Sequence, residues 1–284
     1  MPSLQDIRRR IASVKSTQKI TKAMKMVAAA KLRRAQDAIV SARPYAYNMR
    51  DLTKRLAARA DRESHPLLSP GRSETVALIV VTSDRGLCGG FNSNLVNTTM
   101  RVLREDFAGK PVELIIIGRK GVEALRRRPC TIRATHVGVF EKYSVTASGR
   151  IIEEAANDFV DGRYGEVYCL YNEFKSAISQ KVIVERLLPY ELPEESPGAD
   201  IPYIYEPGES AILFSLLVKN IHVQMHRIFL ESAASEQGAR MAAMDSATKN
   251  AGDVIDRLTL KYNRARQDAI TKEVVEVVSG AEAL

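Results

Sequence analysis

Apolar residues near the start of the chain recur at alternating steps of three and four. The repeat runs from Leu4 to Leu56, and twelve of its sixteen positions are apolar. The four polar positions are Gln18, Thr21, Lys25 and Thr53. A repeat of about 3.5 residues held over this length predicts a helix whose apolar stripe packs against another helix.

The last part of the chain carries the same pattern. No proline follows Pro207, and the apolar steps continue through the C-terminal region. The positions are Met244, Ala247, Ala251, Ile255, Leu258, Tyr262, Ala265 and Ala269. Neither helix would be stable alone in water with its stripe exposed, so we predict that the two terminal helices pair with each other.

The first helix has a capping signal at its start and a proline in its second half. Ser3 is placed to cap the start, with Asp6 three residues further on, as in a capping box. Pro44 disfavours helical geometry at Arg43 and removes a backbone donor, which predicts a kink or a short break. We expect the helix to resume after Pro44 and to end near Ala60.

The middle of the chain alternates between strand and helix patterns. Continuous apolar runs at Val76–Thr82 and Val112–Gly118 are typical of strands that are covered on both faces. The other predicted elements are helices at Asn92–Asp106, Lys120–Arg128 and Thr146–Asp161, strands at Glu166–Tyr171 and Lys181–Leu187, and an ambiguous segment, resembling an edge strand, at Thr131–Val139. This alternation predicts an α/β fold with a small, mostly parallel sheet and helices on both faces.

These patterns divide the chain into four parts. They are an N-terminal helix at 1–60, a polar linker at 61–75, a central α/β domain at 76–207 and a C-terminal helix at 208–284. Five of the eleven prolines fall in 189–207, which marks the exit from the α/β domain. The final helix is expected to start near Glu209.

Charge is distributed unevenly between the two helices. The formal net charge is +8, but residues 1–60 hold fifteen Lys and Arg against three Asp and Glu, whereas residues 206–284 hold nine against eleven. This basic excess makes nucleic-acid binding an alternative. Against it, no aromatic residue lies among the basic residues before Tyr45, and stacking platforms need aromatic side chains. We expect an acidic protein surface or phosphates as the partner, and no nucleic acid.

Candidate catalytic and metal-binding groups are scarce. Cys88, Cys130 and Cys169 show neither metal spacing nor a pairing pattern, which indicates a reducing compartment. His222 and His226 share a helix face at a spacing that could hold a metal, but no HExxH glutamate lies between them, so partly buried histidines are the plainer interpretation. We expect no catalytic residue, no metal and no cofactor. No run of residues approaches the ~18 apolar residues that a membrane-spanning helix needs.

Two glycine-rich turns follow the two buried strands. Ser83–Asn94 and Gly118–Gly121 stand where α/β proteins bind phosphates at the starts of helices. Neither turn has the spacing of a dinucleotide-binding or Walker motif, and no Walker lysine follows. We therefore favour structural turns whose glycines allow close approach of the backbone, and we expect no bound nucleotide.

Two apolar surfaces are not explained by helix pairing. Within Lys19–Lys31, Ile20, Met24 and Val27 form a strip that is rotated from the stripe and flanked by lysines. The strip is either a drift of the stripe with a solvated lysine face or a second face that contacts an outside partner. The apolar tail at Gln267–Leu284 frays, packs against the start of the first helix, or docks into another protein.

Three segments carry a family resemblance. They are IRRRIASVKSTQKITKAMKMVAAAKL near the N-terminus, TSDRGLCGGFN after the first strand and LTLKYNRARQDAITKEVVEVVSGAEAL at the C-terminus. With them, the chain resembles the gamma subunit of F-type ATP synthases from end to end. The resemblance implies a long antiparallel coiled coil of the N- and C-terminal helices and a central Rossmann-like α/β domain. It also implies a non-catalytic rotor shaft, which couples proton flow through the membrane sector to ATP synthesis or hydrolysis in a ring of alpha and beta subunits.

The resemblance further implies partners and contact residues. The alpha and beta subunits would surround the coil, and the epsilon subunit and the membrane rotor ring of c subunits would meet the middle domain. The contact residues are Met24, Lys25, Arg266, Gln267, Thr271 and Glu273. The first two would face the acidic C-terminal loop of the beta subunits, and the next two would engage a loop of an empty beta subunit. The last two lie in the same contact helix, below a tail that would turn in an apolar sleeve of the ring.

The implied location is the cytoplasmic side of a bacterial inner membrane, as a peripheral protein. We expect no transit peptide, because the heptads run well past the usual end of one, and we find no insert with the paired regulatory cysteines of chloroplast relatives. The main alternative is a nucleotide-binding α/β enzyme with helical arms for dimerisation. A nucleic-acid clamp that uses the basic helix is a third class.

Overall fold

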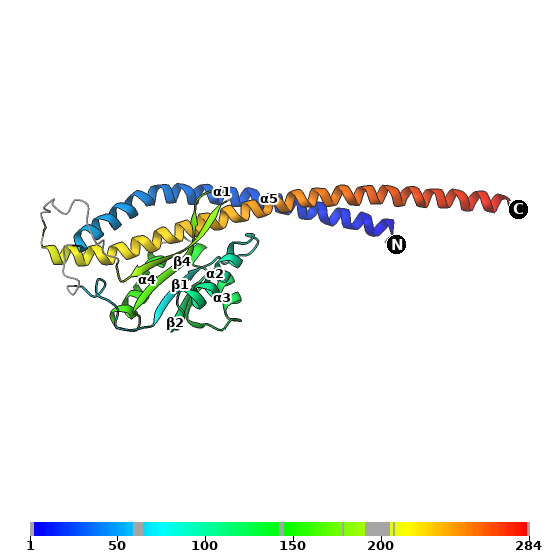
Figure 1. The fold of residues 1–284 in the computed structure, drawn as a ribbon. Helices are drawn as coiled ribbons and strands as arrows, with labels where there is room; N and C mark the ends of the chain where they lie inside the picture. Colours follow the sequence, from blue (N-terminus) through cyan, green and yellow to red (C-terminus); the bar gives the residue numbers. More distant parts are fainter. Residues whose placement is uncertain are drawn as a thin grey trace. The chain divides into compact units, whose positions relative to one another are not determined.

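The computed structural model describes residues 3–58, 65–141, 145–177, 179–190, 205–206 and 208–282. Its two terminal helices are α1 (Leu4–Ala57, 54 residues) and α5 (Glu209–Glu282, 74 residues), with an α/β segment between them in the chain (Figure 1). Contacts group the chain into two compact units. One unit combines Met1–Ala28 with Met241–Leu284, and the other is Ala29–Arg240. Each unit therefore contains part of both long helices, whereas the sequence-based division follows the ends of the elements.

A five-stranded sheet forms the centre of the Ala29–Arg240 unit. Its strands lie in the order β3 (Thr131–His136), β2 (Val112–Ile117), β1 (Val76–Val81), β4 (Glu166–Phe174) and β5 (Gln180–Leu188). The first four strands pair in parallel, and β5 pairs antiparallel with β4. The predicted, mostly parallel sheet is confirmed, and the ambiguous segment forms the edge strand β3.

Helices cover both faces of this sheet. Alternate residues of β1 point to opposite faces, and each set is buried, as the continuous apolar run predicted. Leu78 and the other residues on its face of the sheet pack against α2 (Phe91–Glu105) and α3 (Arg119–Leu125). Ile79 and the other residues on the opposite face of the sheet pack against α4 (Val145–Val160) and against parts of α1 and α5. A short 3-10 helix, η2 (Val139–Glu141), precedes α4 in the chain.

The capping box at the start of α1 is confirmed. The Ser3 hydroxyl accepts a hydrogen bond from the Asp6 N–H at 3.1 Å, and the Asp6 carboxylate accepts from the Ser3 N–H at 3.2 Å. Further along, α1 continues through Pro44 without a break. The kink at Pro44 stays a prediction. The helix ends at Ala57, and the end predicted near Ala60 lies outside the described residues.

Part of the predicted linker packs into the core. Residues 61–64 lie outside the described residues, and residues 65–75 contain no helix or strand. Leu67 and Leu68 are each only 3% exposed and belong to the cluster under α4 and α5. The Tyr190 N–H donates to the Leu67 carbonyl at 3.1 Å, which ties this segment to the residues after β5. Within the described residues, no helix is long and apolar enough to cross a bilayer.

Candidate interaction surface

The paired ends of α1 and α5 form the most distinctive surface. In the unit that combines Met1–Ala28 with Met241–Leu284, the stripe of α1 faces α5: Ile7 is 2% exposed and Ala28 is 1% exposed. Thr21, a polar position of the stripe, is also buried at 9%. The polar positions of α1 therefore stay in the contact face between the helices.

Hydrogen bonds join these polar positions to α5. The hydroxyls of Thr21 and Thr248 lie 2.8 Å apart, and Gln18 Nε2 donates to the Thr248 carbonyl at 3.4 Å. Lys25 Nζ donates to Asp245 Oδ1 at 2.6 Å. These contacts connect residues more than 200 positions apart in the chain and run in antiparallel order. They form a polar layer in an otherwise apolar contact face, a device that fixes register at some cost in stability.

The ion pair in this layer is only half-buried. The side chains of Lys25 and Asp245 retain 43% and 34% exposure. The hydrogen bonds from Lys25 and then Lys249 lower the pKa of Asp245. An ion pair with this exposure is screened by water and contributes little to stability. The Lys25 amine is thus held by α5 but open to solvent.

The rotated strip lies on the outer face of the helix pair. Ile20 is 57% exposed and Val27 is 56% exposed, while Met24 is half-buried. A drift of the stripe would have buried Ile20 and Val27 and exposed Thr21, and the opposite is observed. The drift interpretation is therefore wrong, and the strip is an unpaired apolar face flanked by exposed lysines.

Every residue of α5 from Ile270 to Ser279 is exposed. Arg266, Gln267, Thr271 and Glu273 are exposed, and the Thr271 hydroxyl donates only to the Gln267 carbonyl of its own helix, at 2.9 Å. The apolar residues among them are open too: Ile270, Val274, Val275, Val277 and Val278 are 50–73% exposed. Packing of this tail against the start of α1 is therefore wrong. An apolar helix end of this kind is typical of a surface that another protein covers.

The glycine-rich turn at Ser83–Asn94 is held by protein groups. The Ser83 N–H donates to Asn92 Oδ1 at 3.1 Å, which fixes the turn to the start of α2. Arg240 of α5 donates through Nη2 to the carbonyls of Arg85 and Gly86, both at 3.1 Å. Arg240 is buried and also pairs with Glu236 at 2.7 Å, and burial of Glu236 raises its pKa. The turn is thus a structural contact between the sheet and a long helix, as its sequence favoured.

Protein groups also occupy the second turn, after β2. The Asp84 carboxylate accepts hydrogen bonds from the N–H groups of Arg119, at 3.0 Å, and Gly138, at 3.1 Å. The Gly121 N–H donates to the Thr82 hydroxyl at 2.9 Å. Gly118 has a φ of +96°, and a Cβ there would lie 2.2 Å from the Thr82 carbonyl oxygen. The N–H groups of Arg119 and Gly121, at the start of α3, are thus engaged by side chains of the chain itself.

Cysteine and histidine side chains form no reactive cluster. Burial raises the pKa of Cys88 and of Cys169, so neither favours the thiolate form. His222 and His226 each carry a buried ring nitrogen that has no hydrogen-bond partner among the described residues, and burial lowers the pKa of His226. Among the described residues, no group of three His, Cys, Asp or Glu side chains could hold a metal ion.

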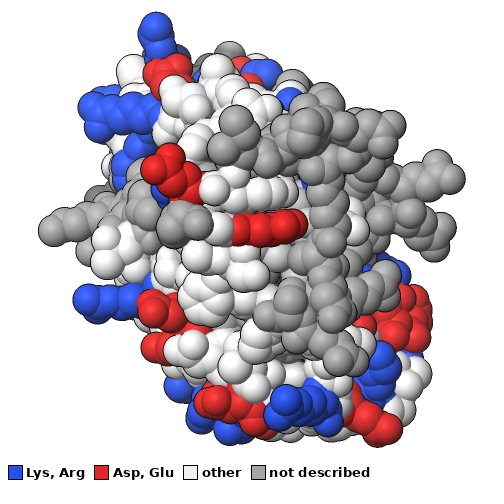
Figure 2. All heavy atoms as spheres, turned by 90° about the vertical axis from the view of Figure 1, so that its left-hand side faces the viewer, with Lys and Arg blue, Asp and Glu red and all other residues white. Residues whose placement is uncertain are grey.

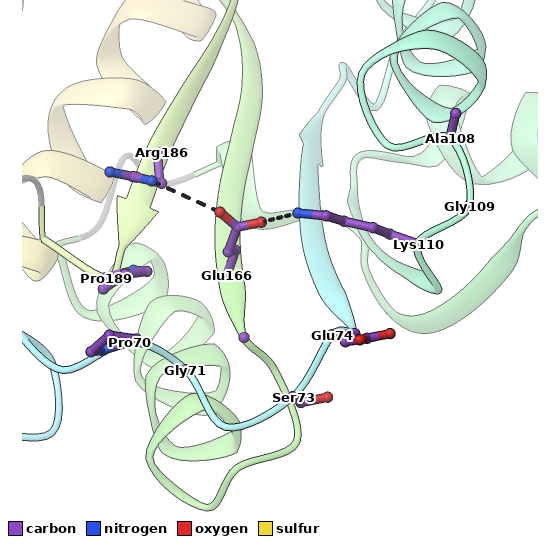
Figure 3. A pocket seen from close by; sticks show the side chains of 11 residues that line it. Pro70, Gly71, Ser73, Glu74, Ala108, Gly109, Lys110, Glu166, Arg186 and Pro189 are labelled. Atoms are coloured by element: carbon purple, nitrogen blue, oxygen red, sulfur yellow. Dashed lines mark hydrogen bonds and ion pairs between the residues drawn. The ribbon is translucent and has the colours of Figure 1, made fainter.

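A hollow at the amino ends of the parallel strands is lined by ion pairs. It measures about 610 Å³, and Figure 3 shows Glu166 between Lys110 and Arg186. Glu166 lies 2.9 Å from Lys110 Nζ and 3.8 Å from Arg186 Nη1.

The face in Figure 2 carries both signs of charge. Side chains of Lys and Arg lie there beside those of Asp and Glu.

Sequence reasoning did not identify three residues that make these contacts. Asp245 and Thr248 complete the polar layer, and Arg240 holds the turn after β1. Polar residues near the apolar row of the C-terminal helix were a signal for the first two. The buried position of Arg240 left no signal, because its acceptors are backbone carbonyls more than 150 residues away in the chain.

Comparison with known proteins identifies the family. The family model described as ATP synthase matches residues 3–284. The ATP synthase gamma chain of Anaeromyxobacter sp. (strain Fw109-5) is 52% identical over 289 residues, which cover 100% of both chains. That of Chlorobaculum tepidum is 47% identical over 291 residues, which cover 100% of this chain and 99% of the relative.

Solved structures agree with this fold. A chain in the cryo-EM structure of the central stalk and c-ring of the Tetrahymena thermophila mitochondrial ATP synthase has a TM-score of 0.61 and 27% identity, over 80% of this chain and 99% of that chain. A chain in a Euglena gracilis mitochondrial ATP synthase structure has the same fold, with a TM-score of 0.73 at 20% identity, over 99% of this chain and 94% of that chain. From its sequence and its fold together, the chain belongs to the ATP synthase gamma chain family.

Proposed function

We propose that this chain is the central-stalk shaft of an F-type ATP synthase. It couples proton flow through the membrane sector to ATP synthesis or hydrolysis by turning within the catalytic ring. Support comes from the full-length gamma chain relatives and from the central-stalk structure that it matches. The observation that carries the proposal is the antiparallel helix pair with an exposed apolar end, since such a surface needs a protein around it.

The chemistry of this surface suits a part that must turn. Exposed lysines around the strip attract acidic loops, but each exposed ion pair contributes only about 0–1 kcal/mol. The surface can therefore attract its surroundings without locking to them. An asymmetric shaft biases each surrounding catalytic site through its different contacts with that site's conformations.

The proposed partners are the alpha and beta subunits around the helix pair, and the epsilon subunit and c-ring at the α/β unit. These assignments extend the family resemblance. We propose that the chain itself is non-catalytic. Its turns after β1 and β2 support this, because Asp84, Thr82 and Arg240 engage them.

Six contact residues follow from the same resemblance. Exposure of Arg266, Gln267, Thr271 and Glu273 is compatible with contact to the ring. Met24 and Lys25 are half-buried, and Lys25 is paired with Asp245. We propose that the Lys25 amine exchanges between Asp245 and a carboxylate of the ring, which the low energy of a half-exposed pair permits.

The proposed location is the cytoplasmic face of a bacterial membrane, as a peripheral part of the complex. The family is that of a membrane-associated enzyme, and gamma chains 47–52% identical to this one come from bacteria. The c-ring would provide the link to the membrane.

A crosslink between the shaft and the ring tests the function. In the assembled enzyme, with the three native cysteines replaced, Lys25→Cys is oxidised to a cysteine in the acidic loop of a beta subunit. ATP hydrolysis should stop and should return when the disulfide is reduced. Lys25→Cys without the partner cysteine is the matched control and should remain active under oxidation. Unchanged hydrolysis with complete crosslinking would contradict the proposed rotation at this site.

A second measurement distinguishes the shaft from a nucleotide-binding enzyme. Equilibrium dialysis of the isolated full-length chain with ATP should show no tight, saturable binding. Binding in the micromolar range or tighter would correspond to about −8 kcal/mol and would favour the enzyme alternative.

A further inference from the structure

The strand order of the sheet contains a topological switch point between β1 and β4. From β1 the chain continues outward to β2 and β3, and it then crosses to β4 on the other side of β1. Helices α2 and α3 cover one face of the sheet and α4 covers the other. In doubly wound sheets, ligands bind at such a point, outside the carboxyl ends of the strands. The groups beside the carboxyl ends of β1 and β4 therefore show what this fold places in the ligand position.

A segment of α5, residues 231–240, lies at this switch point. On the β1 side, Arg240 donates to two carbonyls of the turn that follows the strand, both at 3.1 Å. On the β4 side, the Ser235 hydroxyl donates to the Asn172 carbonyl at 3.1 Å. Ser235 is 0% exposed and Arg240 is 8% exposed, so both side chains are buried in this contact. The chain's own helix thus stands where other doubly wound proteins bind a ligand.

The last residues of β4 form hydrogen bonds with α5 instead of with a strand. Pairing between β1 and β4 extends to Leu170, whereas β4 continues to Phe174. Beyond the paired region, the Phe174 N–H donates to Glu231 Oε2 at 2.9 Å. Two residues earlier, the Asn172 carbonyl accepts the hydrogen bond from Ser235. Side chains of α5 therefore take the place of a neighbouring strand along this part of β4.

A glycine completes the contact face of α5. Gly238 follows Glu231 and Ser235 at helical steps of four and three residues, so the three positions share one face. A Cβ at Gly238 would lie 3.0 Å from the carbonyl oxygen of Ala177 and 3.3 Å from its Cα, in the turn between β4 and β5. Glycine is unfavourable inside a helix relative to alanine. The close approach of two backbones is the physical reason for a glycine at this position.

We propose that the sheet holds this segment of α5 in the position of a ligand, and that Glu231, Ser235 and Gly238 are positioning residues that fix the rotation of α5 on the sheet. Hydrogen bonds are directional, whereas apolar packing is not, so these contacts resist rotation of the helix about its own axis. Torque that reaches the α/β unit passes into α5 at this contact. The role in torque rests on the proposed function, but the docked segment itself does not.

Hydrogen exchange of the full-length chain tests the docked segment. Gly238→Leu places a side chain against the Ala177 backbone. It should speed exchange of the Phe174 amide by about tenfold or more, because the hydrogen bond of that amide to α5 is weakened. The matched control, Ala211→Leu, enlarges an exposed side chain of α5 and should change the rate by less than about twofold. Equal rates in the two variants would overturn the proposal.

The assembled enzyme in inverted membrane vesicles tests the positioning role. Gly238→Leu should lower proton uptake per ATP hydrolysed by about twofold or more, because α5 follows the sheet only in the docked fraction of molecules. Ala211→Leu should keep the ratio of the parent enzyme. A role in stability alone would lower proton uptake and hydrolysis in proportion. An unchanged ratio in Gly238→Leu would therefore contradict the positioning role.

A disulfide keeps the test valid if Gly238→Leu does not fold. With the native cysteines replaced, Ala177→Cys and Gly238→Cys should form a disulfide on oxidation, because a Cβ at position 238 lies 3.3 Å from the Ala177 Cα. Hydrolysis and proton uptake should be retained after oxidation, since the two segments do not move apart during turnover. Failure to form the disulfide would overturn the proposal. So would a loss of turnover that reduction reverses.

The crosslink between shaft and ring separates this proposal from the proposed function. If the chain were not a shaft, oxidation of Lys25→Cys to the ring would leave hydrolysis unchanged. If the docking of α5 alone is wrong, that crosslink still stops hydrolysis, and only the variants at Gly238 and Ala177 give the contrary results.

Discussion

One buried ion pair, Arg43 with Glu231, joins α1, α5 and β4. Arg43 donates through Nε to Glu231 Oε1 at 2.9 Å and through Nη2 to Oε2 at 3.0 Å. The Phe174 N–H adds a third hydrogen bond to Oε2 at 2.9 Å. The two side chains differ in exposure: that of Glu231 is 1% exposed and that of Arg43 is 32% exposed.

This difference in exposure predicts unequal effects on stability. Arg43→Gln leaves a buried carboxylate without its cation and should lower the free energy of unfolding by about 3–5 kcal/mol. Glu231→Gln leaves a guanidinium that is one-third exposed and can turn to water, so the loss should be about 1–2 kcal/mol. The double variant removes both charges and should lose less than the sum, with a coupling of about 1–3 kcal/mol.

Urea unfolding of the full-length chain, followed by circular dichroism at the helix band, measures these values. Arg33→Gln, which removes an exposed charge from the same helix, is the control and should change the unfolding free energy by less than about 0.5 kcal/mol. The reasoning is refuted if Glu231→Gln is as destabilising as Arg43→Gln. It is also refuted if the two single effects add without coupling.

Three further predictions concern other parts of the chain. Burial and then a hydrogen bond to Glu113 raise the pKa of Tyr164 to about 12. Above about pH 10 the phenol therefore ionises in the unfolded chain before it ionises in the folded chain, so stability should fall between about pH 10 and 12. In urea titrations Tyr164→Phe should reduce this fall, whereas Tyr45→Phe, at an exposed side chain, should not. Val27→Glu should change the unfolding free energy by less than about 0.5 kcal/mol, but Ala28→Leu, at a buried contact position, should reduce it by about 1–3 kcal/mol. Arg240→Ala should speed hydrogen exchange in residues 84–90 and lower stability by about 3 kcal/mol, since Glu236 is left buried and unpaired; unchanged exchange would contradict this role.

The sequence predicted the sheet well because its signal is local. The apolar runs of β1 and β2 are buried on both faces, and each predicted run ends within one residue of the observed strand. The start of α5 at Glu209 was also predicted, because the last proline of the chain lies just before it. For these elements, neighbouring residues contain the information that determines the structure.

The outer face of α1 could not be decided from α1 alone. Polar residues at Thr21 and Lys25 fit either a drifting stripe or a polar layer. Their partners, Thr248 and Asp245, lie more than 200 residues away in the chain. Only the pairing of the two helices shows that the polar positions face inward. The apolar strip is therefore assigned to the outer face by a contact that no local pattern contains.

Helix α5 shows why a stripe of apolar residues is an incomplete description. In the Ala29–Arg240 unit it buries charged side chains at Arg227, Glu231, Glu236 and Arg240, each 8% exposed or less. Arg227, Glu231 and Arg240 each bind groups of the sheet, its loops or α1, and Glu236 pairs with Arg240. Breaking such a buried pair costs about 3–5 kcal/mol. The exposed Lys25–Asp245 pair of the other unit is screened by water and contributes little. The same helix thus holds its own α/β unit strongly and offers only weak polar contacts near its free end, which is the distribution of strength that a turning shaft requires.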